Sequence, residues 1–291
     1  MSMLLSLIMG GGLVLLAEYT HDTINSPDDI LEPSQKEHIK ILSSVPLVRM
    51  GGDKAPVEIL DHKRHPQAVN AFGLLRTNLL FPKPEKPIKN ILITSSIRVE
   101  GKTFVSCNLA ISLANIGNRT LIVDADFRKP RMHRIFNLSG KKGISEYLVG
   151  EAELDEVIYQ LPMSNLSLIP CGKVPQNPEL LLTSPKMQEL GSLLKEKFDF
   201  IVYDSPPVSP VADAIVIAAS VADKTIIITR AEHTPRRLFK HVLDTLEEAR
   251  QGIVAGVVIN DVVPSGYYYY RYYKYYRDYY GQDAPAPPPQ P

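Results

Sequence analysis

The sequence has 291 residues, 44% of them hydrophobic and 22% charged, and this composition excludes a chain that is disordered throughout. Lys plus Arg and Asp plus Glu both number 32, so no overall charge favours nucleic acid as a partner. The two Cys and seven His show no spacing typical of a metal centre. The length suits one large domain or two small ones.

The first 18 residues form an apolar run, MSMLLSLIMGGGLVLLAE, which ends at Glu18. It is slightly shorter than the roughly 20 residues that a spanning helix needs. No Lys or Arg precedes it and no small-residue cleavage site follows, which disfavours a secretory signal. A partial membrane span, a buried helix and an interfacial helix stay open, and the lack of large polar residues favours the membrane span.

Residues 19–66 follow as a linker rich in Pro, Asp, His and Lys, with a short ordered piece expected near residues 39–50. The main domain is predicted to cover residues 67–263. Its first element is a helix over 67–81, because apolar residues recur there at helical spacing and Pro82 follows.

From Ile88 onward, short β-branched runs alternate with longer helical stretches. Such alternation is typical of an α/β fold in which a mostly parallel sheet carries helices on both faces. The apolar strand centres agree, because a strand that is buried on both sides does not alternate. The predicted strands are 90–95, 120–125, 166–170, 199–204, 224–230 and 256–260, and the predicted helices are 102–117, 177–197, 211–221 and 234–251.

A Gly-Lys-Thr sequence, residues 101–103, follows the first strand of this domain and opens a helix. In a phosphate loop, backbone N–H groups hold the phosphates, the Lys reaches the β and γ oxygens, and the hydroxyl binds Mg²⁺. Lys102 and Thr103 have the required spacing. Alone the motif is weak, because a strand, turn and helix with a Lys at the helix start also occur without a ligand.

Three carboxylates follow two other predicted strands. Asp124 and Asp126 end one strand, and Asp204 ends another. The carboxyl ends of parallel strands form the ligand crevice of such folds, so these acids should meet Lys102 and Thr103 at one edge. Each Asp alone could simply cap the next helix or turn. The set of three together predicts a nucleotide with Mg²⁺.

The last 28 residues, 264–291, read as an exposed tail. Ten of the fourteen Tyr lie there in one run, which has no period of two or of 3.6, and a Pro-rich end follows. The run could accept phosphate, or it could be low-complexity sequence used for stacking or adhesion. The upstream nucleotide motif favours phosphate acceptance. The candidate acceptors are Tyr267, Tyr268, Tyr269, Tyr270, Tyr272, Tyr273, Tyr275, Tyr276, Tyr279 and Tyr280.

Taken together, these segments resemble the bacterial tyrosine kinases of capsule and exopolysaccharide export. The resemblance rests on SSIRVEGKT, LIVDADFRKP, FDFIVYDSPPV, GLLRTNLLF and KVPQNPELL, with the Tyr-rich tail. It implies a P-loop NTPase fold related to the cell-division and plasmid-partition ATPases. AEYTHDTINSPDDI is similar to the segment that follows the second transmembrane helix of the family's chain-length-regulator module.

The resemblance implies roles for the residues at the sheet edge. Lys102, Asp124 and Asp126 would be catalytic, and Thr103, Asp124 and Asp204 would hold Mg²⁺. The nucleotide would contact residues of the loop and the end of the last strand, where Asn260 matches the position that meets adenine. This implied ATP-binding set is Glu100, Gly101, Lys102, Thr103, Phe104 and Asn260. Arg128 would neutralise the transferred phosphate, or else be a surface charge beside Lys129.

The implied activity is an ATP-dependent tyrosine autokinase that phosphorylates the tail of its own or a neighbouring subunit. The implied partners are further copies of the chain and the membrane proteins of polysaccharide export, at the cytoplasmic face of the bacterial inner membrane. Two alternatives stay open: a catalytically weakened ATP-binding scaffold that regulates the exporter, and a membrane-positioning ATPase, which would have no use for the tail.

The sequence departs from the family pattern at two places. Val99 stands where the phosphate loop usually has a Gly, and a β-branched residue at positive φ costs about 1–2 kcal/mol. In the helix that joins subunits, Asn70 and Gly73 replace charged residues, so that only Arg76 remains. These changes put ATP binding and ring formation in question without removing a group that does chemistry.

Overall fold

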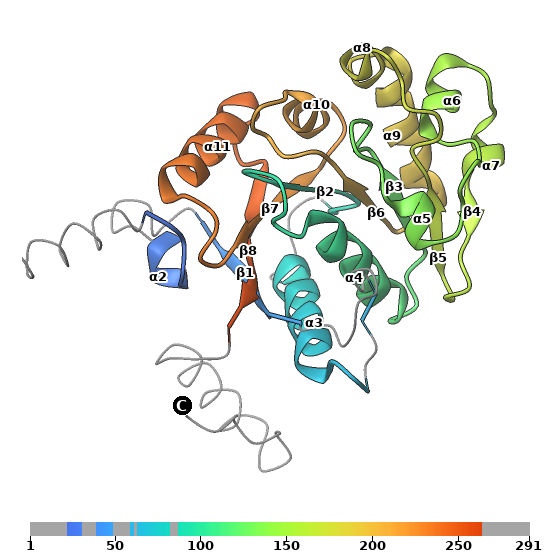
Figure 1. Ribbon diagram of the computed structural model, residues 1–291. Helices are drawn as coiled ribbons and strands as arrows, with labels where there is room; N and C mark the ends of the chain where they lie inside the picture. Colours follow the sequence, from blue (N-terminus) through green and yellow to red (C-terminus); the bar gives the residue numbers. More distant parts are fainter. Residues whose placement is uncertain (1–21, 31–38, 49–58, 61–62, 82–86, 264–291) are drawn as a thin grey trace, which may run out of the picture.

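The computed structural model describes residues 22–30, 39–48, 59–60, 63–81 and 87–263. The apolar run 1–18 and the Tyr-rich tail 264–291 lie outside the described residues. Within the described part of the chain, no helix is long and apolar enough to cross a membrane. Figure 1 shows the described residues as one central sheet between helices.

The sheet has eight strands in the order β1-β8-β7-β2-β6-β3-β5-β4. Every neighbouring pair is parallel except β4 and β5. The inner strands are buried on both faces, as their uninterrupted Val, Ile and Leu runs predict. The strands are β1 (Ile41–Pro46), β2 (Asn90–Ser95), β3 (Thr120–Asp124), β4 (Tyr159–Gln160), β5 (Leu166–Ile169), β6 (Phe200–Asp204), β7 (Lys224–Arg230) and β8 (Val254–Val262).

Helices cover both faces of the sheet. The helices α3 and α4 pack on one face, whereas α9, α10 and α11 pack on the other, and each layer has its own hydrophobic core cluster. The helices are α2 (Pro27–Ile30), α3 (Pro66–Leu80), α4 (Lys102–Ala114), α5 (Met132–Ile135), α6 (Ile144–Val149), α7 (Leu154–Val157), α8 (Pro178–Leu182), α9 (Pro185–Lys197), α10 (Asp213–Ser220) and α11 (Arg236–Ala249). The predicted fold class is therefore confirmed.

Two regions differ from the prediction in the number or type of their elements, beyond shifts of a few residues at element ends. The helix expected over 177–197 is two helices, because the Ser184 hydroxyl accepts a hydrogen bond from the Met187 N–H and starts α9 afresh, with Pro185 in its first turn. The ordered piece expected near residues 39–50 is the strand β1, which pairs with β8. One strand of the sheet thus comes from the segment predicted to be a linker.

The remaining cation of the subunit-contact motif is engaged inside the chain. The Arg76 guanidinium on α3 donates to the Ser112 carbonyl at 2.8 Å and to the Ser112 hydroxyl at 2.9 Å. Ser112 lies on α4, so this contact joins the two helices of one layer. Arg76 therefore supports the helix that starts at the phosphate loop.

Candidate active site

The phosphate loop connects β2 to α4, and two of its residues have left-handed backbone conformations. Val99 has φ +66° and Gly101 has φ +91°. The Val99 side chain is 70% exposed, so it gains no packing that would offset its strain. The sequence-based expectation that Val99 stands at a position favouring Gly is confirmed.

Buried side chains form hydrogen bonds that support the backbone of this loop. The Glu100 carboxylate accepts hydrogen bonds from the Ile97 N–H at 2.8 Å and from the Thr234 hydroxyl. The Asn260 amide donates to the Glu100 carbonyl at 3.1 Å and lies so close to Gly101 that a Cβ there would be 2.1 Å from Asn260 Nδ2. Burial raises the pKa of Glu100, although these hydrogen bonds and Lys102 oppose the shift.

Glu100 and Asn260 were predicted to bind the nucleotide directly. Both are buried, and the hydrogen bonds that the structure gives them support the loop backbone. The Asn260 Oδ1 atom is buried without a hydrogen-bond partner within the described part of the chain. A contact between Asn260 and adenine stays a prediction.

A hydrogen-bonded trio joins the start of α4 to the end of β6. The Thr103 hydroxyl donates to Asp204 Oδ2 at 2.7 Å, and the Ser106 hydroxyl donates to Asp204 Oδ1 at 2.9 Å. Sequence reasoning identified Thr103 and Asp204 but missed Ser106. The signal was available, because residues three apart lie on the same face of a helix.

The carboxylates after β3 bind the backbone of the segment that follows them. Asp124 Oδ2 accepts from the N–H groups of Arg131 at 3.2 Å and Met132 at 3.0 Å. Asp126 Oδ1 accepts from the N–H groups of Arg128 at 3.2 Å and Lys129 at 2.9 Å. Asp124 is fully buried, and its Oδ1 atom has no partner within the described residues.

Burial dominates the electrostatics of the site. It raises the pKa of Asp124 to about 8, with the nearby charges of Asp204 and Asp126 adding to the shift. Burial also raises the pKa of Asp204 to about 6, against the hydrogen bond from Thr103 and the charge of Lys102. The same burial lowers the pKa of Lys102, although Asp204 and Asp126 oppose the change.

A hydrated Mg²⁺ fits this set of donors. Asp124 and Asp204 occupy directly paired positions on neighbouring strands, so their carboxylates start from backbones about 5 Å apart. The unpartnered Asp124 oxygen and the Thr103 hydroxyl are hard oxygen donors of the kind that Mg²⁺ prefers. A cation there would also offset the repulsion between the two buried acids.

Two other predicted residues have contacts that point away from the phosphates. The Phe104 ring packs edge-on against Phe72 of α3, with ring centroids 5.7 Å apart, so the side chain is engaged in the helix layer. Arg128 forms a two-pronged ion pair with the buried Asp213 at 2.8 and 2.9 Å. This pair leaves Arg128 less free to neutralise a transferred phosphate.

The fold and this site define a P-loop nucleotide-binding domain. In agreement, the family model described as an AAA domain matches residues 91–256. The sequence is 36% identical over 202 residues to a putative tyrosine-protein kinase CapB of Staphylococcus aureus, with 68% of this chain and 88% of CapB covered. It is 34% identical over 209 residues to a tyrosine-protein kinase CpsD of Streptococcus agalactiae, covering 71% of this chain and 90% of CpsD. The chain belongs to the bacterial tyrosine kinase family.

A longer relative and two solved structures complete the comparison. A putative tyrosine-protein kinase EpsB of Ralstonia nicotianae is 30% identical over 276 residues, which cover 90% of this chain but only 36% of EpsB. The kinase domain of Escherichia coli ETK has a TM-score of 0.74 at 29% identity, over 84% of this chain and 97% of that one. The chimerical protein CapA2B2 has a TM-score of 0.72 at 28% identity, over 82% and 100%.

Proposed function

We propose that this protein is an ATP- and Mg²⁺-dependent tyrosine autokinase that phosphorylates the Tyr-rich tail, residues 267–280, of its own or a neighbouring subunit. The observation that carries the proposal is the Thr103–Asp204–Ser106 trio beside the buried Lys102 and Asp124. Kinase relatives that match most of the chain support the reaction type, and the run of ten Tyr supplies acceptors.

The residues divide the work of phosphoryl transfer, which needs positioning and charge neutralisation more than covalent chemistry. The loop N–H groups and Lys102 hold the β and γ phosphates of ATP. Thr103, Asp204 and Asp124 would hold Mg²⁺, and the ion would supply neutralisation of charge on the phosphates.

A Tyr hydroxyl then attacks the γ phosphorus. The new Tyr O–P bond forms as the bond between that phosphorus and the ADP oxygen breaks. Asp126 receives the phenol proton through Oδ2, because Oδ1 accepts the two backbone N–H groups.

The setting of the reaction follows from the family resemblance. The chain is proposed to work with further copies of itself and with membrane chain-length-regulator proteins, at the cytoplasmic face of the bacterial inner membrane. The solved chimera CapA2B2, which the chain resembles, supports an association between two kinds of component. Exopolysaccharide or capsule export is the process that the kinase would regulate.

Incubation of the purified chain with MgATP, followed by mass spectrometry, tests the proposal. Phosphate is expected on residues 267–280 and is expected to disappear in Lys102→Met and Asp126→Ala. Lys240→Glu, a change at an exposed position of α11, serves as the control and should keep the wild-type pattern.

A second candidate function is an ATP-binding scaffold without kinase activity. The left-handed Val99 favours it, because a strained phosphate loop positions the γ phosphate less well. Measured ATP binding with no phosphotyrosine on any residue would select the scaffold. ATP hydrolysis without phosphotyrosine would select a positioning ATPase instead.

A further inference from the structure

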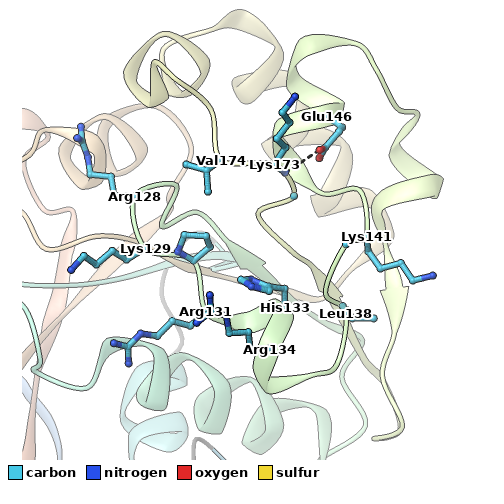
Figure 2. Close-up of a pocket in the computed structure, with 13 residues that line it drawn as sticks. Arg128, Lys129, Arg131, His133, Arg134, Leu138, Lys141, Glu146, Lys173 and Val174 are labelled. Atoms are coloured by element: carbon cyan, nitrogen blue, oxygen red, sulfur yellow. Dashed lines mark hydrogen bonds between the residues drawn. The ribbon is translucent and has the colours of Figure 1, made fainter.

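A cavity of about 620 Å³ lies between the segment that follows Asp126 and the turn after β5. Figure 2 shows Arg128, Lys129, Arg131, His133 and Arg134 along one side of this cavity, with Lys141, Lys173 and Val174 on the other sides. The cavity has no phosphate-loop residue in its lining. Its ionisable lining residues are Arg128, Lys129, Arg131, His133, Arg134, Lys141, Glu146 and Lys173.

The lining is strongly cationic. Within the described part of the chain, Lys129, Arg131 and Arg134 form no ion pair. The one acid, Glu146, is already satisfied, because its carboxylate accepts from the N–H groups of Gly143 at 2.8 Å and Lys173 at 2.9 Å. Burial alone would raise the pKa of Glu146, but these bonds hold it below its usual range. The cavity is therefore suited to an anion with several negative charges.

The cavity borders the proposed reaction centre. Arg131 lines it, while the Arg131 backbone N–H binds Asp124. Burial lowers the pKa of Lys102 and the Arg131 charge adds to this shift, which the nearby acids oppose. Asp126 holds the first turn of the same segment through Arg128 and Lys129. A phosphate group that leaves the reaction centre on a Tyr side chain would meet this cavity next.

We infer that the cavity is a binding site for the phosphorylated tail, in which Arg131, Arg134 and Lys173 hold phosphotyrosine. This inference rests on the proposed function, because the kinase reaction supplies the ligand. Arg side chains bind phosphate through paired, charge-assisted hydrogen bonds. The unphosphorylated run 267–280 carries three cations and one anion, and the cavity repels it. Each phosphate adds about −1.5 to −2 charges and reverses that preference.

The tail is long enough to reach the cavity. It follows β8, which lies four strand positions from β3 in the sheet, or roughly 19 Å at the usual strand spacing. Tyr272 is nine residues beyond Val263, and nine extended residues span about 30 Å. The stretch from Val263 to Tyr272 is therefore long enough to span the separation between β8 and β3, next to the cavity.

A peptide-binding experiment tests the inference independently of kinase activity. The full chain is treated with a tyrosine phosphatase and kept free of ATP, and fluorescence anisotropy follows a labelled synthetic peptide of residues 264–281. One form carries phosphotyrosine at positions 272, 273, 275 and 276, and the other form carries none. We expect the phosphorylated form to bind at least about tenfold more tightly.

Two charge-reversal variants locate the site. Arg134→Glu and Lys173→Glu should each weaken binding of the phosphorylated peptide at least about tenfold, whereas Lys240→Glu, an equal change of charge on α11, should leave it unchanged. Both positions are exposed, and thermal unfolding confirms that each variant is folded. A chain without kinase activity could still bind the phosphorylated peptide. The experiment therefore tests the binding site independently of the proposed kinase function.

Four results would overturn the inference. The first is equal binding of the two peptides, and the second is equal loss in Arg134→Glu and Lys240→Glu. The third result uses vesicles of equal parts phosphatidylcholine and phosphatidylserine. If the Arg134→Glu variant no longer binds these vesicles but still binds the phosphorylated peptide, the cavity is a membrane-binding surface. The fourth result is complete displacement of the phosphorylated peptide by an equimolar amount of pyrophosphate, which would show that the cavity binds anions without specificity for the peptide.

Discussion

Two loops meet at the same edge of the sheet, and they are held in opposite ways. The phosphate loop depends on side chains from far along the sequence, because Thr234 and Asn260 bind its Glu100. The segment after β3 depends on neighbours, because Asp124 and Asp126 bind N–H groups only two to eight residues away.

The two loops differ in whether the same residues support the backbone and contact the ligands. The groups after β3 serve both as local supports and as the proposed ligands of metal and substrate, so structure and chemistry there share residues. In the phosphate loop, different residues have these two roles: Lys102 and Thr103 are the proposed ligand contacts. Glu100 and Asn260 support the loop backbone from the protein interior. We therefore expect the phosphate loop to respond to distant substitutions and the β3 segment to respond to pH.

The largest effect is expected for Gly101→Ala. The new Cβ would be strained at φ +91° and would displace the Asn260 amide, so the variant should lose about 3–5 kcal/mol of unfolding free energy. Gly117→Ala is the matched control, because Gly117 has φ +92° but nothing within 4 Å of the added atom. It should lose only about 1–2 kcal/mol. Urea denaturation measures both, and equal losses would show that Asn260 does not support the loop.

The next effect is a pH dependence that belongs to Asp124. Its pKa of about 8 in the folded protein lies above the ordinary value of 3.8, so the folded state holds a proton that the unfolded state has released. Stability should therefore fall as pH rises, by about 2 kcal/mol between pH 6 and pH 8 without Mg²⁺. Asp204 has a pKa of about 6, so the loss of stability that its ionisation causes occurs mainly below pH 6.

Asp124→Asn provides the control for this pH dependence. The amide oxygen still accepts the hydrogen bonds of Arg131 and Met132 but cannot ionise. Denaturation curves at pH 6 and pH 8 should then differ much less than in the unsubstituted protein. An unchanged difference would assign the titration to another group.

A smaller effect is expected for Thr234→Val, which removes the hydroxyl that binds Glu100. A buried carboxylate oxygen left without this partner should cost about 1–2 kcal/mol of unfolding free energy. Thr245→Val is the control on α11, where an exposed hydroxyl binds only the His241 carbonyl. If ATP affinity falls in Thr234→Val but not in Thr245→Val, the loop is held from a distance; equal affinities would contradict that view.

The smallest effect is expected for Val99→Gly. Removing the β-branched side chain relieves about 1–2 kcal/mol of left-handed strain, while the added freedom of Gly in the unfolded chain costs about 1 kcal/mol. Unfolding free energy should therefore rise by no more than about 1 kcal/mol. Titration with ATP should show equal or tighter binding, and weaker binding would mean that Val99 itself contributes to the site.

The sequence allowed the sheet and its active edge to be predicted where the information is local. Continuous β-branched runs predicted the inner strands, and the ends of those runs placed Asp124 and Asp204. The Lys102 and Thr103 positions followed from the strand, turn and helix around them. Even the strain at Val99 was predictable, because one departure from a known loop pattern indicated it.

The rest depends on contacts that no local pattern encodes. The inward orientation of Glu100 requires Thr234, which is 134 residues away. The recruitment of β1 depends on its pairing with β8, near the other end of the described chain. The cationic cavity combines side chains from residues 128–141 with the turn at Lys173, and α6, α7, β4 and β5 separate the two in the sequence.

The two outermost strands of the sheet are poor templates for further pairing. β1 ends in Pro46, which has no N–H to donate, and β4 is antiparallel and only two residues long. Copies of the chain that gather at high local concentration therefore have little means of fusing their sheets into a continuous ribbon. Contacts between copies through helices and loops are favoured instead.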